Sequence, residues 1–206
     1  MNFLSMALMA LVLFSCGGGS GKKGSGGKSL FTPVSSGHPY EMLVVIDKDM
    51  WERPAGRALF NALDMDVPGL PQPERSFRIS QIIPDKFERG FRIFRNIIDV
   101  DIQPIYTQPK LKYSRDSYAS PQMIMTIQAP DEASFEEFVN QNKQVIVDFF
   151  TKAEMNRQIN LLKEKYSDVV ATKVGSMFGC DVRVPVGFER YKQGKDFFWT
   201  SEDRPG

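Results

Sequence analysis

The chain has 206 residues with 42% hydrophobic and 25% charged side chains, which is close to the globular average and excludes a wholly disordered or collagen-like protein. Its formal net charge of +1 lacks the basic excess of a non-specific nucleic-acid binder, so we expect no nucleic-acid partner. One His and two Cys exclude most zinc sites and most His-based catalysis, so we expect no cofactor and no metal.

The N-terminus is typical of an exported lipoprotein. Residues 1–15 contain an uncharged apolar run from Phe3 to Phe14, which is shorter than the ~20 residues of a membrane-spanning helix and fits the core of a signal peptide. The run ends in Ser15-Cys16 and resembles the lipobox of bacterial lipoproteins, so we predict that Cys16 is lipidated and anchors the protein to a membrane. A plain signal peptide cleaved near Ser15, or a buried N-terminal helix, is the alternative.

Residues 16–37 continue from Cys16 with a high density of Gly, Ser and Lys, which predicts a flexible tether. One α+β domain is expected over residues 38–206. Apolar runs predict strands over residues 40–47, 77–82, 96–102, 122–128, 180–185 and 196–200. Residues 103–121 are predicted to be irregular.

Helical spacing of apolar residues predicts a helix over residues 49–63 that Asp49 caps, and residues 84–90 allow a short helix. Asp131 is expected to cap a long amphipathic helix, and a further helix is expected to end before Gly179. This order suits a mixed or antiparallel sheet with helices packed on one face, in the style of split-βαβ (ferredoxin-like) folds. The apolar run Phe197 to Trp199 lies close to the last residue, which suggests a chain truncated at its C-terminus.

No complete catalytic set is present, and we assign no catalytic residue. Cys180 is the only cysteine besides Cys16, and its only possible histidine base, His38, lies at the end of the tether, so we expect a buried and inert thiol. Asp99 and Asp101 lie two residues apart in a strand and point to one face, which makes them weak candidates for binding a divalent cation or for acid–base chemistry. The alternation of a solvated strand face explains the same spacing without a site.

The segment over residues 110–122 is the most suggestive of binding. Aromatic rings beside hydrogen-bonding side chains are typical of interfaces with polar ligands and proteins. The candidate contacts are Lys112, Tyr113, Arg115, Asp116, Tyr118 and Gln122. The alternative is an ordered connection that packs Tyr113 and Tyr118 on the core.

Several long runs resemble a known family: PYEMLVVID, DVPGLPQPE, FRNIIDVDI, SRDSYASPQMIMTIQ, DFFTKAEMNRQI, MFGCDVRVP and KDFFWTS. They are similar to envelope lipoproteins of Bacteroidetes-type bacteria that are defined only as a domain of unknown function (family 4837). The resemblance covers residues 38–200. It implies export, a lipid anchor and relatives that continue further, and it brings no activity, cofactor or site residue.

We therefore expect a lipid-anchored protein of the bacterial cell envelope that faces the periplasm, with the outer membrane favoured. Its domain is expected to bind an envelope protein or a polar ligand without catalysis. One alternative is an envelope hydrolase of glycans or peptidoglycan, in which one of these carboxylates would line a cleft: Glu41, Asp47, Asp99, Asp101 or Asp116. The other is a structural part of a larger lipoprotein assembly, which would leave apolar surface exposed around Phe197, Phe198 and Trp199.

Overall fold

A computed structural model describes residues 32–202. The predicted signal peptide, Cys16 and the tether up to residue 31 lie outside the described residues. Residues Val34 and Ser36, which the sequence assigns to the tether, form isolated bridges to Ser120 and Phe94. The ordered domain therefore begins before residue 38.

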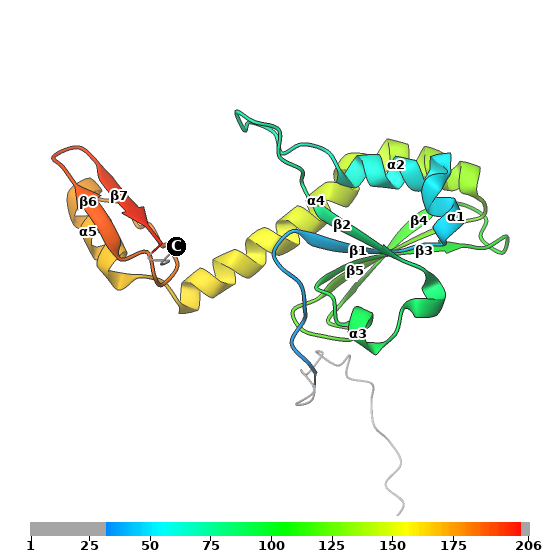
Figure 1. The fold of residues 1–206 in the computed structure, drawn as a ribbon, viewed down its shortest axis with the longest axis horizontal. Coiled ribbons are helices and arrows are strands. Elements are labelled where there is room, and N and C mark those ends of the chain that lie inside the picture. Colours follow the sequence, from blue (N-terminus) through cyan, green and yellow to red (C-terminus); the bar gives the residue numbers. More distant parts are fainter. Residues whose placement is uncertain (1–31, 203–206) are drawn as a thin grey trace, which may run out of the picture. The chain divides into compact units, whose positions relative to one another are not determined.

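A five-stranded mixed sheet organises the domain, with the strand order β2-β1-β3-β5-β4 (Figure 1). The strands are β1 (Glu41–Val45), β2 (Arg78–Ile82), β3 (Asn96–Ile102), β4 (Lys110–Arg115) and β5 (Met123–Ala129). Strand β1 pairs in parallel with β2 and β3, and β3 pairs in parallel with β5, whereas β4 is antiparallel to β5. The predicted α+β class with a mixed sheet is confirmed, with more parallel pairing than a split-βαβ fold has.

Helices α1 (Lys48–Glu52), α2 (Pro54–Leu63) and α4 (Glu132–Glu164) lie on one face of this sheet, while the 3-10 turn η1 (Pro84–Lys86) and α3 (Arg89–Arg92) connect β2 to β3 (Figure 1). The side chain of Asp131 accepts the backbone N–H of Ser134 and caps α4 as predicted. Helix α4 has non-helical backbone at Asn142 (φ −112°, ψ 16°), where it kinks. None of the helices over residues 32–202 is long and apolar enough to cross a bilayer.

Alternating side chains of the strands divide the core between the two faces of the sheet. On the face of α2 and α4, Met42 and Ile98 pack against Phe135 and Phe150 in the larger cluster. On the other face, a smaller cluster is covered by Phe87 and Phe94 and consists of Leu43, Val45, Ile82, Ile97 and Ile124. Asp99 and Asp101 alternate with Ile98 and so share the second face with Ile97.

The single helix predicted over residues 49–63 is wrong, because α1 and α2 are separate. Pro54 lacks an N–H and disfavours helical backbone at the preceding residue, and Arg53 is extended (φ −82°, ψ 167°). Asp47, rather than Asp49, caps α1, and its Oδ1 accepts the backbone N–H of Asp49 and Met50.

Two further assignments are wrong. Residues 110–115, predicted to be irregular, form β4 on the edge of the sheet, and residues 180–185, predicted to be a strand, have no regular structure. Helix α5 (Asp168–Phe178) precedes them and ends as predicted at Gly179, whose φ of +68° favours glycine. The C-terminal strands are β6 (Arg190–Gln193) and β7 (Phe198–Ser201), which form a separate antiparallel pair.

Candidate functional site

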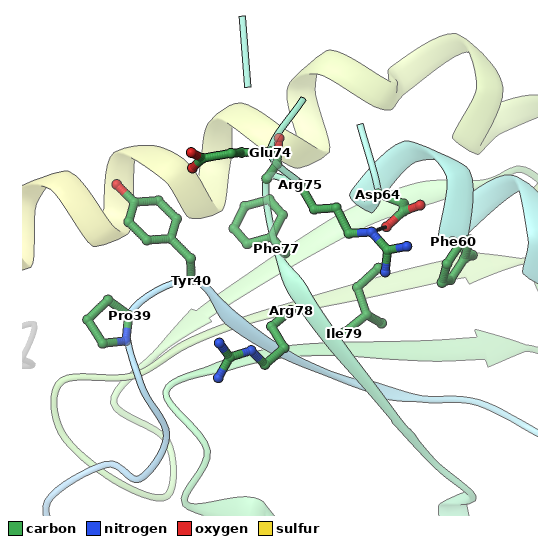
Figure 2. Close-up of a pocket in the computed structure, with 10 residues that line it drawn as sticks. Pro39, Tyr40, Phe60, Asp64, Glu74, Arg75, Phe77, Arg78 and Ile79 are labelled. Carbon is green, nitrogen blue, oxygen red and sulfur yellow. Dashed lines mark ion pairs between the residues drawn. The ribbon is translucent and has the colours of Figure 1, made fainter. Parts of the chain in front are cut away.

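A pocket of about 500 Å³ lies where α2 ends and where β1 and β2 begin (Figure 2). Its apolar wall is formed by Pro39, Tyr40, Phe60, Phe77 and Ile79. Its polar wall is formed by Asp64, Glu74, Arg75, Ser76 and Arg78. Most of these residues come from two segments that are far apart in the sequence, residues 39–40 and 74–79, which lie side by side because β1 and β2 are adjacent parallel strands.

The proline-rich connection from α2 to β2 forms one rim of the pocket. Asp64 ends α2, and the chain then returns so that Asp66 and Arg75 form an antiparallel bridge. The base of this connection is fixed, because the Ser76 hydroxyl donates to the Met65 carbonyl at 2.6 Å and the Ser76 N–H donates to the same oxygen at 2.9 Å. These bonds hold residues 74–76 beside the end of α2.

Tyr40 has a left-handed backbone conformation with φ of +60°, which is uncommon for a residue other than glycine. Such a conformation costs on the order of 1–3 kcal/mol and persists only where the surroundings hold it. The Tyr40 carbonyl accepts the N–H of Arg78 at 2.9 Å, and its ring centroid lies 6.3 Å from that of the buried Phe77. These contacts hold the half-exposed Tyr40 ring at the pocket wall.

Two ion pairs set the charge around the pocket. Arg75 Nε lies 3.1 Å from Asp64 Oδ1 (dashed line in Figure 2), and Arg78 Nη1 lies 3.2 Å from Glu41 Oε1. The backbone N–H of His38, which Glu41 Oε2 accepts at 2.8 Å, lowers the pKa of Glu41 against the opposing effect of burial, and Arg78 lowers it further. Both arginines are mostly exposed, so their remaining N–H groups are free to meet a ligand.

The residues predicted to contact a ligand do not line this pocket. Lys112, Tyr113 and Arg115 lie on β4, where the Tyr113 ring packs on Phe149 of α4 with centroids 4.7 Å apart. This contact gives Tyr113 a structural role on the helix-covered face.

The other three predicted contacts lie at the turn that leads into β5. Gln122 is buried and donates to the carbonyls of Arg92 and Phe94, and its backbone N–H donates to Asp116 Oδ1 at 2.7 Å. Gln122 Oε1 accepts the N–H of Tyr118. These hydrogen bonds hold the turn together.

The candidate acidic pair lies on the sheet face opposite α2 and α4. Burial tends to raise the pKa of Asp101, but hydrogen bonds from Tyr106, Gln128 and Gln103 outweigh burial and lower the pKa below its ordinary value. Burial and then the charge of Asp101 raise the pKa of Asp99. No group of three or more His, Cys, Asp or Glu side chains that could hold a metal ion occurs within residues 32–202.

Cys180 is exposed, which corrects the expectation of a buried thiol. Residues 180–185 are mostly exposed coil and do not form the predicted strand. His38 donates its backbone N–H to Glu41.

The pocket itself was not predicted from the sequence. The one local signal was the proline-dense segment over residues 66–73, because a constrained loop beside aromatic and charged residues can form the rim of a site. The pairing of Tyr40 with the start of β2 is non-local, and no sequence pattern indicates it.

Comparison with known proteins adds a family and no named activity. No curated protein and no solved structure matches the chain. A family model described as a domain of unknown function (DUF8532) matches residues 35–163, which include the whole five-stranded sheet and the pocket. Because this match covers more than half of the 206 residues, the chain belongs to the DUF8532 family.

Proposed function

We propose that this chain is a lipid-anchored protein of the cell envelope whose periplasm-facing domain binds a polar ligand or an envelope protein and has no catalytic activity of its own. The observation that supports the binding role is the pocket between the end of α2 and the starts of β1 and β2. The anchor and the location rest on the sequence around Cys16.

The chemistry of the pocket suits recognition rather than catalysis. The rings of Tyr40, Phe60 and Phe77 offer flat apolar surface, and the guanidinium groups of Arg75 and Arg78 offer several hydrogen-bond donors. A matching ligand has a ring or apolar face and carries hydrogen-bond acceptors at its edge.

Photocrosslinking in the native cell tests this proposal. The full chain would carry p-benzoylphenylalanine in place of Tyr40, and irradiated envelopes would be analysed by mass spectrometry for protein or glycan adducts. The control is the same replacement at Phe91 on α3, which is 45% exposed against 38% for Tyr40 and does not line the pocket. We expect a reproducible adduct from position 40 alone. Irradiation without an adduct at position 40 contradicts the binding role.

The anchor needs a separate test. We expect Cys16→Ala to move the protein from the membrane fraction to the soluble fraction, since the acyl chains that hold it would be absent. If the variant stays in the membrane fraction to the same extent as the wild type, the lipid anchor is wrong.

A second candidate function is structural, and exposed aromatic residues favour it. Phe197 is 55% exposed and Trp199 is 51% exposed, and both lie in or beside the short β6–β7 pair. Large exposed rings on a two-stranded sheet are typical of a surface that a partner covers. If this candidate is right, Trp199→Ser reduces the size of the detergent-solubilised complex on native electrophoresis, whereas Val186→Ser, at a position that is 61% exposed, does not.

A hydrolase is supported less well. This alternative requires that at least one of five named carboxylates lines a cleft, and none of the five lines the pocket, whose acidic residues are Asp64 and Glu74. Asp99 has a raised pKa, as a general acid would, but Asp101 beside it is held by three hydrogen bonds.

A further inference from the structure

We propose that the outer edge of β2 binds an extended peptide segment of an envelope protein, which adds to the sheet as a further strand and places a side chain in the pocket. The binding role proposed above for the pocket is a premise, and the partner is narrowed here to a protein. Strand addition to an open sheet edge is a common mode of peptide recognition, in which main-chain hydrogen bonds supply affinity and side-chain pockets supply specificity.

Strand β2 forms one edge of the five-stranded sheet, and among the described strands it pairs with β1 alone. At the start of β2 the Arg78 N–H donates to the Tyr40 carbonyl at 2.9 Å, and at its end the Ile82 carbonyl accepts the N–H of Ile46 at 2.9 Å. The even-numbered residues of β2 therefore direct their backbone groups toward β1.

The odd-numbered residues of β2 direct their backbone groups away from the sheet. Successive residues of a strand point their N–H and C=O groups to opposite sides, so those of Ile79 and Gln81 lie on the open side of β2. These groups have no hydrogen-bond partner within residues 32–202, and both residues are partly exposed. Donors and acceptors that alternate at strand spacing match the backbone of another strand, which a glycan does not offer.

The two edges of the sheet differ in how well they are protected from pairing. Strand β4, at the opposite edge, carries three cationic side chains, Lys110, Lys112 and Arg115. Residues 79–82 of β2 contain no charged side chain and no proline. Charged side chains and proline are usual means by which an edge strand avoids pairing, so β2 is the edge that is open to a partner.

The pocket adjoins the open edge, because Phe77 and Ile79 line it at the start of β2. Both side chains pack with the larger core cluster and so lie on the sheet face of α2, from which Phe60 also lines the pocket (Figure 2). Alternate side chains of an added strand project to this same face. An apolar or aromatic side chain of the peptide fits this wall, and the guanidinium groups of Arg75 and Arg78 can donate to polar groups beside it.

Photocrosslinking along the edge tests the proposal. The full chain would carry p-benzoylphenylalanine in place of Ser80 on β2, in cells grown beside those that carry it at position 40, and the captured residues would be sequenced by mass spectrometry. Ser114 on β4 is the control position, because it is also exposed and lies on the opposite edge. We expect positions 40 and 80 to capture neighbouring residues of one protein segment, and position 114 to capture none of them.

The identity of the adduct separates strand addition from the binding role itself. A glycan or small-molecule adduct at position 40 would leave the pocket a binding site and would overturn the peptide as its ligand. Strand addition is also overturned if positions 40 and 80 capture unrelated segments, or if they capture residues 16–31 of this chain. The absence of any adduct at position 40 overturns the binding role and the peptide together.

A proline variant tests the main-chain hydrogen bonds. Gln81→Pro removes one N–H on the open side, where proline is compatible with an edge strand. Gln81→Ala is the matched control, because it also loses the bond from Gln81 Nε2 to the Ile46 carbonyl but keeps the backbone N–H. We expect Gln81→Pro to reduce the protein adduct at position 40 by about three- to tenfold relative to Gln81→Ala, which corresponds to one hydrogen bond.

Equal adduct yields in the two variants of Gln81 would overturn strand addition. Circular dichroism and thermal unfolding check that both variants are folded. If Gln81→Pro does not fold, the comparison of positions 80 and 114 decides the question.

Discussion

The carboxylate of Glu154 on α4 lies 2.8 Å from the guanidinium of Arg95, the residue before β3, and Glu154 is fully buried. The other oxygen of Glu154 lies 2.8 Å from Arg157, one turn further along α4. The buried Asn96 at the start of β3 donates to Glu154 Oε1 at 2.7 Å and to the Glu41 carbonyl at 2.9 Å. This network joins α4 to the amino ends of β1 and β3.

Glu154→Gln should lower the free energy of unfolding by about 3–5 kcal/mol. The variant leaves the largely buried guanidinium groups of Arg95 and Arg157 without their counter-charge. Burial already lowers the pKa of Arg157, which shows that its charged form is disfavoured at this position. Denaturant titration of the full chain measures the change. Glu164→Gln at the exposed end of α4 is the control and should change stability by less than about 0.5 kcal/mol. A loss below about 1 kcal/mol in Glu154→Gln would mean that the network adds little.

Asp99→Asn should stabilise the protein at neutral pH and lose this advantage in acid. Burial raises the pKa of Asp99 in the folded state above the ordinary value of 3.8, so folding favours the protonated form. The contribution of Asp99 to stability is therefore complete below 3.8 and declines as the pH rises through the folded-state pKa. Unfolding free energies measured at neutral pH and below the ordinary value check the difference.

Asp101 gives the opposite pH dependence. Burial opposes ionisation of Asp101, but its three hydrogen bonds lower its pKa below the ordinary value of 3.8. Its contribution to stability is present above that value and is lost as the pH falls through the lower folded-state pKa. Asp101→Asn should therefore destabilise the protein at neutral pH and much less in strong acid. Equal destabilisation at both pH values would show that its charge is unimportant.

Gly56→Ala should destabilise the domain by several kcal/mol, on the scale of a badly overpacked core. A Cβ at this position would lie 2.3 Å from the Met50 carbonyl oxygen and 2.5 Å from Trp51 Cα, so α1 and α2 would have to separate. Gly90→Ala in α3 is the matched control, because nothing lies within 4 Å of its Cβ position. The control should be neutral or slightly stabilising, and thermal unfolding of both variants measures the contrast. Equal melting temperatures would contradict the close packing of α1 on α2.

Local signals in the sequence account for the elements that were predicted correctly. Strands β3 and β5 carry the apolar patterns of buried strands, and Asp131 and Gly179 mark helix ends by their own chemistry. Strand β4 was missed because its side chains are mostly polar and exposed, and its pairing with β5 defines it. Such a strand depends on tertiary contacts that no local pattern contains.

The acidic pair on β3 and the buried network around Glu154 also differ in how far the sequence predicts them. The shared face of Asp99 and Asp101 follows from the two-residue period of a strand and was predicted. Gln128 and Tyr106 join that cluster only through register and loop geometry. The buried network around Glu154 joins α4 to β3 across a long stretch of sequence, and a glutamate in a long helix gives no sign of it.

Arg75→Ala should separate ligand recognition at the pocket from stability. The side chain is 72% exposed and its pair with Asp64 is a surface ion pair, so its removal should cost less than about 1 kcal/mol. Arg75 nevertheless lines the pocket, so we expect the adduct from p-benzoylphenylalanine at position 40 to fall several-fold. Arg115→Ala is the matched control, because Arg115 is 76% exposed, pairs with Asp116 and lies away from the pocket on β4. An adduct yield in Arg75→Ala equal to that of the wild type would show that Arg75 plays no part in recognition, and an equal loss in both variants would point to a general effect of surface charge.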